Sequence, residues 1–589
     1  MTESVWPGGV APWWTRAVVY QIYPRSFADS NGDGVGDLGG IRQHLDHLAD
    51  LGVDVIWLSP VYPSPQHDNG YDISDYQNIE PLFGTLDEFD ALLAEVHERG
   101  MRLVMDLVVN HTSDEHPWFV ESKSSPDNPK RDWYWWRDAR GGHQPGEPGA
   151  EPTNWRSFFS GPSWQLDEAT GQYYLHLFAV QQPDLNWENP DVRAAVYAMM
   201  NWWLDRGVDG FRMDVINFIS KHLDLPEAPV APGETLADGA PFFVSGPRIH
   251  EFLHEMNEKV FAGRDAQLIT VGEMPGVTID DARQFTDPQS AEIDMVFQFE
   301  HVGLDHGPGG KFDPQPLDLV ALKHSLARWQ EGLGTVGWNS LYLDNHDQPR
   351  LVSRFGDDGE YRYESATLWA TALHLHRGTP YIYQGEEIGM TNVPFESITD
   401  YRDVETLNHY LEATGERGAS AESVMPGIRS SSRDNARTPV QWNDGPQAGF
   451  TTGEPWIGVN PNYLEVNAER DRASERSVFR FYQRLIELRH TSDLVALGTF
   501  ELLEAAHPTL YAFTRSLGDE KLLVVANVSG EPLELWPLSD GAGTLLAPWA
   551  GDEPHLLIAN LPASAAAPDA RTLAPWEVRV YGLTARKSA

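Results

Sequence analysis

Polar side chains capable of acid–base chemistry lie at or near the ends of four short apolar runs in this chain. They are Asp106, Asn110 and His111 at the run 102–110, Arg212 and Asp214 at 208–215, Glu273 at 268–274, and Asn345, His346 and Asp347 at 340–345. Gathering so many charged groups inside a protein costs free energy, and a purely structural framework does not need them. The pattern therefore predicts a reactive site.

Two of these carboxyl groups have the surroundings that glycoside cleavage requires. In that reaction one carboxylate attacks the anomeric carbon, while a second carboxyl group protonates the leaving oxygen and then activates water. Arg212 lies two residues before Asp214, so both side chains point the same way and the arginine keeps Asp214 ionised. Glu273 follows Val271 and Gly272, a less polar setting that suits a carboxyl group holding its proton.

The other polar residues have supporting roles in this hypothesis. Asp347 is placed to stabilise positive charge or to bind sugar hydroxyl groups, and His111 and His346 are expected to donate hydrogen bonds to the same ring. For Asp106 we favour a structural role, in which it orients Arg212. The competing interpretation of the two histidines is ordinary core packing.

The elements that must position these residues alternate along the chain. Apolar runs separated by amphipathic helical patterns predict an α/β fold with a parallel sheet, and eight such units favour a closed (β/α)8 TIM barrel. Barrel enzymes carry their reacting groups at the C-terminal ends of the strands, which is where the polar residues fall. The runs cover residues 17–27, 53–62, 102–110, 208–215, 268–274, 295–300, 340–345 and 380–384, and the helical patterns cover 38–51, 86–99, 190–206, 247–261, 317–331, 363–377 and 474–490.

The chain divides into four predicted segments. Residues 1–110 and 182–495 form the two parts of the catalytic barrel. Residues 111–181 are rich in Trp, Pro, Gly and Asp and have no clean period, which predicts a small domain inserted after strand 3. Residues 496–589 hold short alternating apolar runs separated by Gly, Pro and Asp, which predict a C-terminal antiparallel β domain.

Seven motifs, in this order along the chain, resemble the α-amylase family of glycoside hydrolases, in its oligo-1,6-glucosidase and α-glucosidase branch. The resemblance covers about residues 15–490. The motifs are DNGYDISDY at 68–76, DLVVNH at 106–111, QPDLNWENP at 182–190, GFRMDVIN at 210–217, GEM at 272–274, DNHDQPR at 344–350 and ARTPVQW at 436–442. Any one of them is weak, whereas the ordered set is specific.

The resemblance implies a role for each matching residue. It makes Asp214 the nucleophile, Glu273 the general acid/base and Asp347 the transition-state stabiliser. The residues expected to hold the terminal glucose are Asp68, Tyr71, His111, Phe158, Phe178, Gln182, Arg212, His346 and Arg437.

Four of these residues carry a further expectation or an alternative. Asp68 and Arg437 would bind the outer hydroxyl groups of the glucose, which would limit the enzyme to chain ends. For Phe158 and Phe178, ordinary packing competes with pocket lining, because aromatic rings commonly fill such walls.

We therefore expect a retaining, exo-acting α-glucosidase that hydrolyses terminal non-reducing α-glucosidic bonds of short oligosaccharides through a covalent glucosyl-enzyme. Val215 after the nucleophile resembles the α-1,6-preferring members, although one methyl-scale contact shifts preference by only about 1–3 kcal/mol. The alternatives are an α-1,4-glucosidase, or a glucosyltransferase or isomerase acting on sucrose, maltose or trehalose. A catalytically inactive interaction subunit is disfavoured because the carboxylates are present.

Residues 29–37, DSNGDGVGD, predict a structural Ca2+ site. Oxygen-bearing side chains recur there at alternate positions, and Gly34 allows a sharp turn. Position twelve is Gly40 rather than Glu, so the loop is not an EF-hand; the resemblance implies a structural calcium in the same loop. The expected ligands are the side chains of Asp29, Asn31, Asp33 and Asp37 and the carbonyl group of Val35. A solvated acidic turn is the alternative, and no organic cofactor is expected.

Composition limits the partners and the compartment. The 589 residues carry a formal net charge of −44, which disfavours binding to nucleic acid or anionic lipid. This acidity fits either a compositional bias or solubility at high salt. The absence of cysteine excludes disulfides and thiolate catalysis. No apolar run is long enough to span a membrane, and the first residues make a poor signal peptide, so a cytoplasmic protein is expected. The expected partner is a small α-gluco-oligosaccharide, and the expected assembly is a monomer or small homo-oligomer.

Overall fold

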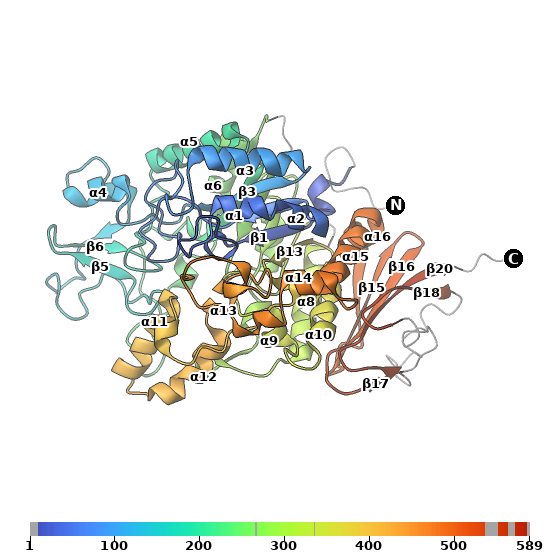
Figure 1. Ribbon diagram of the computed structural model, residues 1–589. Helices are drawn as coiled ribbons and strands as arrows, with labels where there is room; N and C mark the ends of the chain where they lie inside the picture. Colours follow the sequence, from blue (N-terminus) through green and yellow to red (C-terminus); the bar gives the residue numbers. More distant parts are fainter. Residues whose placement is uncertain (1–9, 265–267, 335, 536–551, 563–571, 586–589) are drawn as a thin grey trace.

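A barrel of parallel strands forms the centre of the protein. The computed structural model describes residues 10–264, 268–334, 336–535, 552–562 and 572–585. Within these residues eight strands pair in the order β12-β13-β1-β2-β3-β7-β8-β9, and all of these pairings are parallel. This confirms the predicted (β/α)8 barrel (Figure 1). The strands are β1 (Val19–Ile22), β2 (Val55–Leu58), β3 (Arg102–Val108), β7 (Gly210–Asp214), β8 (Ile269–Glu273), β9 (Met295–Phe297), β12 (Ser340–Leu341) and β13 (Thr379–Tyr383).

An isolated bridge closes the barrel between its two edge strands, β9 and β12. Val296 in β9 pairs in parallel with Asn339, the residue before β12. The amide of Val296 also donates a hydrogen bond to the carbonyl oxygen of Trp338, at 3.2 Å. The barrel is therefore closed, but this seam has fewer hydrogen bonds than the regular strand pairs.

Helices surround the barrel, and their ends follow local sequence signals. The side chain of Thr85 caps α3 in a reciprocal capping box with Glu88, as predicted, and α5 ends at Gly207, whose φ is 109°. Among the described residues, none of the helices is long and apolar enough to cross a membrane. The helices packed on the barrel are α1 (Leu38–Gln43), α2 (Leu45–Leu51), α3 (Leu86–Glu98), α5 (Pro190–Arg206), α6 (Ile249–Met256), α7 (Ile279–Phe285), α8 (Leu319–Leu333), α9 (Leu351–Phe355), α10 (Arg362–His374) and α15 (Val478–Thr491).

Two predicted helices differ from the structure in detail. The pattern over 38–51 forms two helices that meet at His44, whose ring stacks on Trp442 with 3.7 Å between ring centroids. The pattern over 247–261 ends in a π-helical segment, Asn257–Phe261. In the first case a contact with a residue far along the chain accompanies the break, which no local pattern could reveal.

Residues 111–181 form a small antiparallel unit at the C-terminal end of the barrel. It contains α4 (Pro117–Ser124) and a sheet of β4 (Trp136–Arg137), β6 (Gln172–Leu175) and β5 (Trp164–Asp167). The segment between β7 and α6 shares its core. Trp155 donates a hydrogen bond through Nε1 to the carbonyl oxygen of Pro226 at 2.9 Å, and Trp155 also pairs with Ala237. The residues that follow Asp214 are thus anchored on this unit.

A second irregular segment lies beside the barrel mouth and carries two arginines that matter below. It contains α11 (Val404–Leu411), α12 (Ala421–Ser431), α13 (Asp434–Arg437) and α14 (Ala468–Ala473). The two arginines are Arg437, the last residue of α13, and Arg433, which immediately precedes that helix.

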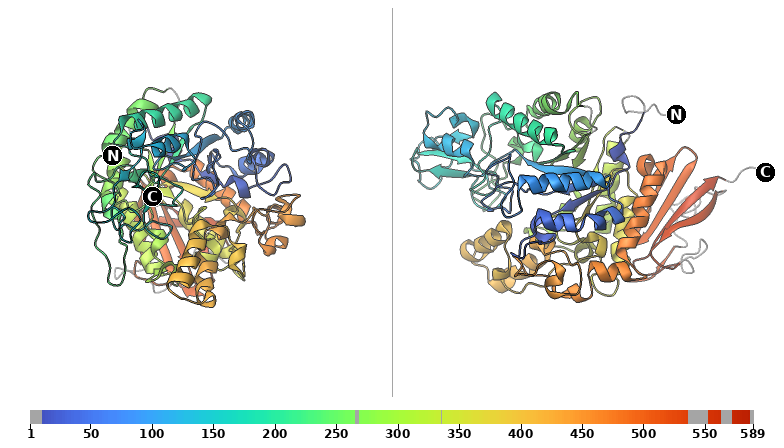
Figure 2. Two further views of the ribbon diagram at one scale, coloured as in Figure 1. Left: turned by 90° about the vertical axis from the view of Figure 1, so that its left-hand side faces the viewer. Right: turned by 45° about the horizontal axis from the view of Figure 1, so that its top comes forward.

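The predicted C-terminal antiparallel β domain is confirmed. It lies at the opposite end of the barrel from the small unit of residues 111–181 (Figures 1 and 2). Lys323 on α8 joins it to the barrel, because its Nζ donates hydrogen bonds to the carbonyl oxygens of Glu504, His507 and Leu510 at 3.0, 2.7 and 2.9 Å. The strands are β14 (Thr499–Leu503), β15 (Leu510–Leu517), β16 (Glu520–Asn527), β20 (Val578–Ala585) and β18 (Asp552–Ala559), with β17 (Leu533–Glu534) and β19 (Thr572–Leu573) as a separate pair.

Candidate active site

Three carboxylates surround the guanidinium group of Arg212 near the C-terminal ends of β3, β7 and β8. Nη1 of Arg212 donates to Oδ1 of Asp106 at 3.0 Å and to Oδ1 of Asp214 at 2.7 Å. Nη2 forms an ion pair with Oε1 of Glu273. All four residues are buried. The three strands are neighbours in the sheet, so residues separated by more than 160 positions meet around one cation.

The backbone at Val215 directs a hydrogen bond to Glu273. Val215 follows the last residue of β7 and has φ 35° and ψ 41°, a left-handed conformation that is unfavourable for a β-branched residue. Its amide donates to Oε2 of Glu273 at 3.0 Å. Strain of this kind costs on the order of 1–3 kcal/mol and persists only where the surrounding structure enforces it.

Burial changes the proton affinity of two of the carboxyl groups. It raises the pKa of Glu273 well above its usual range, although the charge of Arg212 opposes the shift. Burial also raises the pKa of Asp106 to about 7, again against Arg212. Asp106 accepts hydrogen bonds from Tyr71 Oη at 3.0 Å and Trp57 Nε1 at 3.1 Å. Glu273 therefore retains a proton to higher pH than an ordinary glutamate does.

Two arginines and three aspartates form a network on another side of the mouth. Arg437 Nη2 donates to Asp347 Oδ1 at 2.7 Å, and Arg433 Nη1 donates to the same oxygen at 3.2 Å. Arg433 Nη2 also donates to Asp68 Oδ1 at 3.1 Å, and its Nε donates to Asp403 Oδ1 at 2.8 Å. We call these five residues the arginine–aspartate network.

The two predicted site aspartates of this network differ in proton affinity. Burial raises the pKa of Asp68 to about 7, because the charges of Arg433 and Arg437 only partly offset the loss of solvation. Burial acts in the same direction on Asp347, but His346, Arg433 and Arg437 outweigh it and lower the pKa of Asp347 below its usual range. Asp347 therefore stays ionised at neutral pH.

The remaining polar residues expected in the pocket lie in contact with one another. The ring of Tyr71 stacks on His346, with 5.3 Å between centroids and 8° between planes. His111 Nε2 lies 3.1 Å from the carbonyl oxygen of Tyr71 and 3.1 Å from Gln182 Nε2. Gln182 Nε2 also donates to Asp68 Oδ2 at 3.2 Å. These contacts connect the network to the group around Arg212.

The two predicted aromatic residues occupy different positions. The ring of Phe178 lies 5.2 Å from His111, beside the polar residues. Phe158 stacks on Phe178 at 5.2 Å and on Phe218 at 5.7 Å, and 47% of its surface is exposed. Phe158 is thus partly exposed, and packing explains only part of its environment.

Comparison with known proteins agrees with this geometry. Residues 21–498 match the catalytic domain of alpha-amylase. The chain belongs to the alpha-amylase family. This confirms the resemblance drawn from the motifs, and it makes the protein a glycoside hydrolase.

Relatives of this alpha-amylase family protein have several names. It is 56% identical to an oligo-1,6-glucosidase of Parageobacillus thermoglucosidasius, over 97% of this chain and 98% of that one. It is 50% identical to a trehalose-6-phosphate hydrolase of Bacillus subtilis strain 168, over 97% and 98%. The solved structure of an isomaltulose synthase from Protaminobacter rubrum superposes with a TM-score of 0.90 at 41% identity, covering 98% of this chain and 100% of that one. The relatives support glycosidase activity. Their different names do not specify which glycosidic linkage this protein cleaves.

Sequence reasoning missed two arginines of this alpha-amylase family site. Arg433 lies four residues before Arg437, a spacing that places two side chains on one helical face and could have revealed it. Arg25 has no such signal. Its guanidinium group donates to Asn69 Oδ1 at 2.9 Å and to Gln66 Oε1 at 2.8 Å, on either side of Asp68.

The acidic loop after β1 is folded onto its own backbone. Asp29 accepts hydrogen bonds from amides within the loop, Asn31 Oδ1 from the amide of Asp33 at 2.9 Å, and Asp33 Oδ1 from the amide of Val35 at 2.9 Å. Asp37 caps α1. In the part of the chain that the structure describes, no three His, Asp or Glu side chains converge to hold a metal ion. The loop supplies the hard oxygen donors that Ca2+ prefers, but they do not face a common point.

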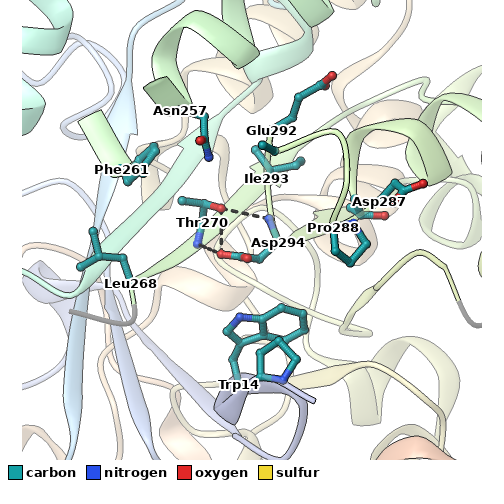
Figure 3. Close-up of a pocket in the computed structure, with 13 residues that line it drawn as sticks. Trp14, Asn257, Phe261, Leu268, Thr270, Asp287, Pro288, Glu292, Ile293 and Asp294 are labelled. Carbon is teal, nitrogen blue, oxygen red and sulfur yellow. Dashed lines mark hydrogen bonds between the residues drawn. The ribbon is translucent and has the colours of Figure 1, made fainter. Parts of the chain in front are cut away.

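A hollow of about 350 Å³ lies at the opposite end of the barrel, near the starts of β8 and β9 (Figure 3). Trp14 and Leu268 line it, together with Asp294, which accepts hydrogen bonds from the amide and hydroxyl groups of Thr270 at 2.8 and 2.9 Å. Residues at this N-terminal end of a TIM barrel usually contribute to stability, and the reacting groups lie at the other end. The site described above is therefore the candidate for catalysis.

Proposed function

We propose that this protein is a retaining, exo-acting α-glucosidase that releases glucose from the non-reducing ends of short oligosaccharides and favours α-1,6 bonds. Asp214 acts as the nucleophile, Glu273 as the general acid/base and Asp347 as the stabiliser of the positively charged transition state. The observation that carries this proposal is the contact of Asp214 and Glu273 with the same guanidinium group.

The shared guanidinium favours a retaining mechanism. It holds two carboxyl groups close together, which fits the spacing of about 5–5.5 Å in retaining enzymes better than the about 6.5–9.5 Å in inverting enzymes, where water must fit between. In the first step Glu273 gives its proton to the glycosidic oxygen while Asp214 bonds to the anomeric carbon; the bond between that carbon and the glycosidic oxygen breaks, and the leaving sugar departs as an alcohol. In the second step Glu273 takes a proton from water, whose oxygen displaces Asp214.

The arginine–aspartate network supports exo action. Asp68 and Arg437 present polar atoms that suit the outer hydroxyl groups of a terminal glucose, and Arg433 ties Asp68 to Asp347. In the proposed mode of binding, this network would bound the site for the terminal glucose, so that one glucose unit lies before the bond to be cleaved. The leaving sugar would then lie towards the rim, where Phe158 is exposed.

The preference for α-1,6 bonds has two supports. The oligo-1,6-glucosidase relative is 56% identical over nearly the whole chain. Val215 lies directly after the proposed nucleophile, and a valine at this position resembles the α-1,6-preferring members of the family. The alternatives are an α-1,4-glucosidase, or a glucosyltransferase or isomerase. Relatives named as a trehalose-6-phosphate hydrolase and an isomaltulose synthase support considering activities other than α-1,6 hydrolysis.

The deciding experiment is a product profile of the purified protein on isomaltose, maltose, sucrose, trehalose and trehalose 6-phosphate. We expect glucose from isomaltose at the highest kcat/KM, released first as the α-anomer in NMR spectra. Initial release of the β-anomer would refute the retaining mechanism. Isomeric disaccharides formed from sucrose would favour an isomerase, and preference for trehalose 6-phosphate would favour a phosphodisaccharide hydrolase.

We also propose that residues 29–37 bind a structural Ca2+ through Asp29, Asn31, Asp33, Val35 and Asp37. Oxygen donors at alternate positions support the proposal, and the loop side chains would have to turn from their own amides to the ion. After treatment with a chelator, we expect the melting temperature to rise when Ca2+ is restored, because a ligand that binds only the folded state stabilises it. The Asp33→Ala variant should show no such rise. A wild-type melting temperature indifferent to Ca2+ would contradict the proposal.

A further inference from the structure

The imidazole ring of His346 is held between aromatic residues on three sides. Tyr71 stacks on one face at 5.3 Å, Tyr23 lies over the ring at 6.1 Å with 20° between planes, and Trp57 meets it edge-on at 5.9 Å. His346 itself is buried. This packing fixes the ring plane, so the directions of its two nitrogen atoms are fixed as well.

The two nitrogen atoms of that ring face different partners. Nδ1 lies 2.8 Å from the side-chain nitrogen of Gln21 in β1, and the same nitrogen donates to Ser59 Oγ at 3.1 Å. Nε2 lies 3.4 Å from Oδ2 of Asp347. An amide nitrogen has two hydrogens and no free lone pair, so it can only donate. Nδ1 must therefore accept, and the proton of a neutral ring must be on Nε2.

The surroundings also keep the ring neutral. Burial lowers the pKa of His346 to about 3; Asp347 opposes this shift, whereas Arg212, Arg437 and Arg433 reinforce it. A neutral imidazole has one proton, so its tautomer decides whether it can donate towards the pocket.

We propose that Gln21 is a positioning residue that holds His346 in the Nε2–H tautomer, so that the ring donates a hydrogen bond towards Asp347 and the bound sugar. This inference rests on the proposed glucosidase function for its substrate. The structure does not repeat this pattern at His111, whose Nδ1 lies 3.2 Å from the side-chain nitrogen of Asn110 but whose Nε2 faces both the carbonyl oxygen of Tyr71 and the side-chain nitrogen of Gln182 at 3.1 Å.

The geometry gives a specific expectation for the Gln21→Glu variant. The introduced carboxylate would accept a hydrogen bond from Nδ1–H, and its negative charge would raise the pKa of His346. Below that raised pKa the ring carries both protons, so Nε2–H is still present. As the pH rises through it, the ring keeps Nδ1–H for the glutamate and loses Nε2–H. We expect kcat/KM to fall on the order of tenfold to hundredfold there, giving an alkaline limb at a lower pH than in the wild-type protein.

Two other variants separate this effect from general damage. Gln21→Met removes both the donor and the titratable group, so it should lower activity by a similar factor at all pH values, with no new limb. Gln384→Glu places a buried carboxyl group in the neighbouring strand loop while keeping the acceptor that binds the amide of Tyr23 at 2.8 Å. It should not move the pH profile.

Neutron diffraction from the deuterium-exchanged wild-type protein tests the tautomer without any substrate. We expect deuterium on Nε2 of His346 and the Gln21 nitrogen facing Nδ1. Deuterium on Nδ1 would overturn the proposal, as would a Gln21→Glu profile with the wild-type shape. If the protein hydrolyses none of the glucosides, the proposed function fails, but the neutron result still decides the tautomer.

Discussion

Glu273 and Asp214 contact the same arginine, and the different roles proposed for them fit the differences between their other neighbours. Glu273 accepts a hydrogen bond from the strained amide of Val215, and burial raises its pKa. A carboxyl group with a raised pKa is suited to proton donation at neutral pH, whereas the carboxylate that attacks must be ionised. The raised pKa of Glu273 therefore supports its proposed role as the acid.

The pH dependence tests this assignment. The proton-donating form of Glu273 is present below its raised pKa and is lost as the pH rises through it, so wild-type kcat/KM on isomaltose should fall on the alkaline side. We expect Glu273→Gln to lose about 10²–10⁴-fold in kcat, because it has no proton to give. Its residual activity should lack the wild-type alkaline limb in a pH–rate profile. A limb that persists would belong to another group.

The side chain after the nucleophile tests the linkage preference. We expect Val215→Thr to raise kcat/KM on maltose relative to isomaltose, by up to the about 1–3 kcal/mol that one methyl-scale contact can change. The backbone must stay left-handed, and threonine is β-branched like valine, so any change reflects the side chain rather than new flexibility. An unchanged ratio in parallel assays would separate Val215 from linkage choice.

At the scale of elements, the loop after β2 depends on Arg25. Gln66 and Asn69 both have left-handed backbones, with φ 68° and 50°, and the same guanidinium group binds both side chains. Asp68 lies between them and reaches Arg433. Arg25 also lies 4.7 Å from the ring of Trp456. The loop conformation that presents Asp68 is thus fixed from outside the loop.

We expect Arg25→Gln to raise KM for isomaltose about tenfold with a smaller change in kcat, because Asp68 would be held less firmly while the groups around Arg212 stay in place. Steady-state kinetics measures the split. Arg99→Gln, which removes an exposed ion pair with Asp46, is the matched control and should keep wild-type constants. An equal loss in both variants, or a fall in kcat alone, would be incompatible with this role.

The sequence predicted the barrel well because the barrel strands lie within apolar runs, and because helices such as α3 bury one face of a 3.6-residue period. It also predicted the residues around Arg212, since they belong to motifs at strand ends. Arg25 and Gln21 were missed for a physical reason, because each acts on a residue distant in the chain that only the closed barrel brings near. Arg433 also acts on a distant residue, although its four-residue spacing from Arg437 was visible in the sequence.

Contacts between residues distant in the chain also explain two differences between the predicted elements and the structure. The helical pattern over 38–51 is locally sound, and the break at His44 coincides with stacking on Trp442. The segment between β7 and α6 has no period of its own and packs through Trp155 of the small unit. The predicted boundaries at residues 111, 182 and 496 remain predictions, because shared cores make such limits gradual.

At the scale of the whole molecule, Lys323 joins the barrel to the C-terminal sheet. Its three hydrogen bonds satisfy carbonyl oxygens of the segment that leads from β14 into β15. We expect Lys323→Met to lower the free energy of unfolding by about 3 kcal/mol, because those carbonyl groups lose their donor. Denaturant unfolding measures the change, and Lys259→Met, at an exposed lysine, is the control. Equal stability of both variants would show that the three hydrogen bonds of Lys323 do not stabilise the fold.

The isolated bridge between β9 and β12 makes this junction the place where we expect the barrel to open locally most easily. Asp106, Asp214 and Glu273 belong to three adjacent strands on the continuous arc, whereas Asp347 follows the short strand at the seam. Transient opening there would leave the distance between Asp214 and Glu273 unchanged. It would alter only the distance of Asp347 from these two residues. Thermal fluctuation would then modulate how well the cationic transition state is stabilised, while bond making and proton transfer keep a rigid frame. Amide hydrogen exchange at Val296 should therefore be faster than within β7.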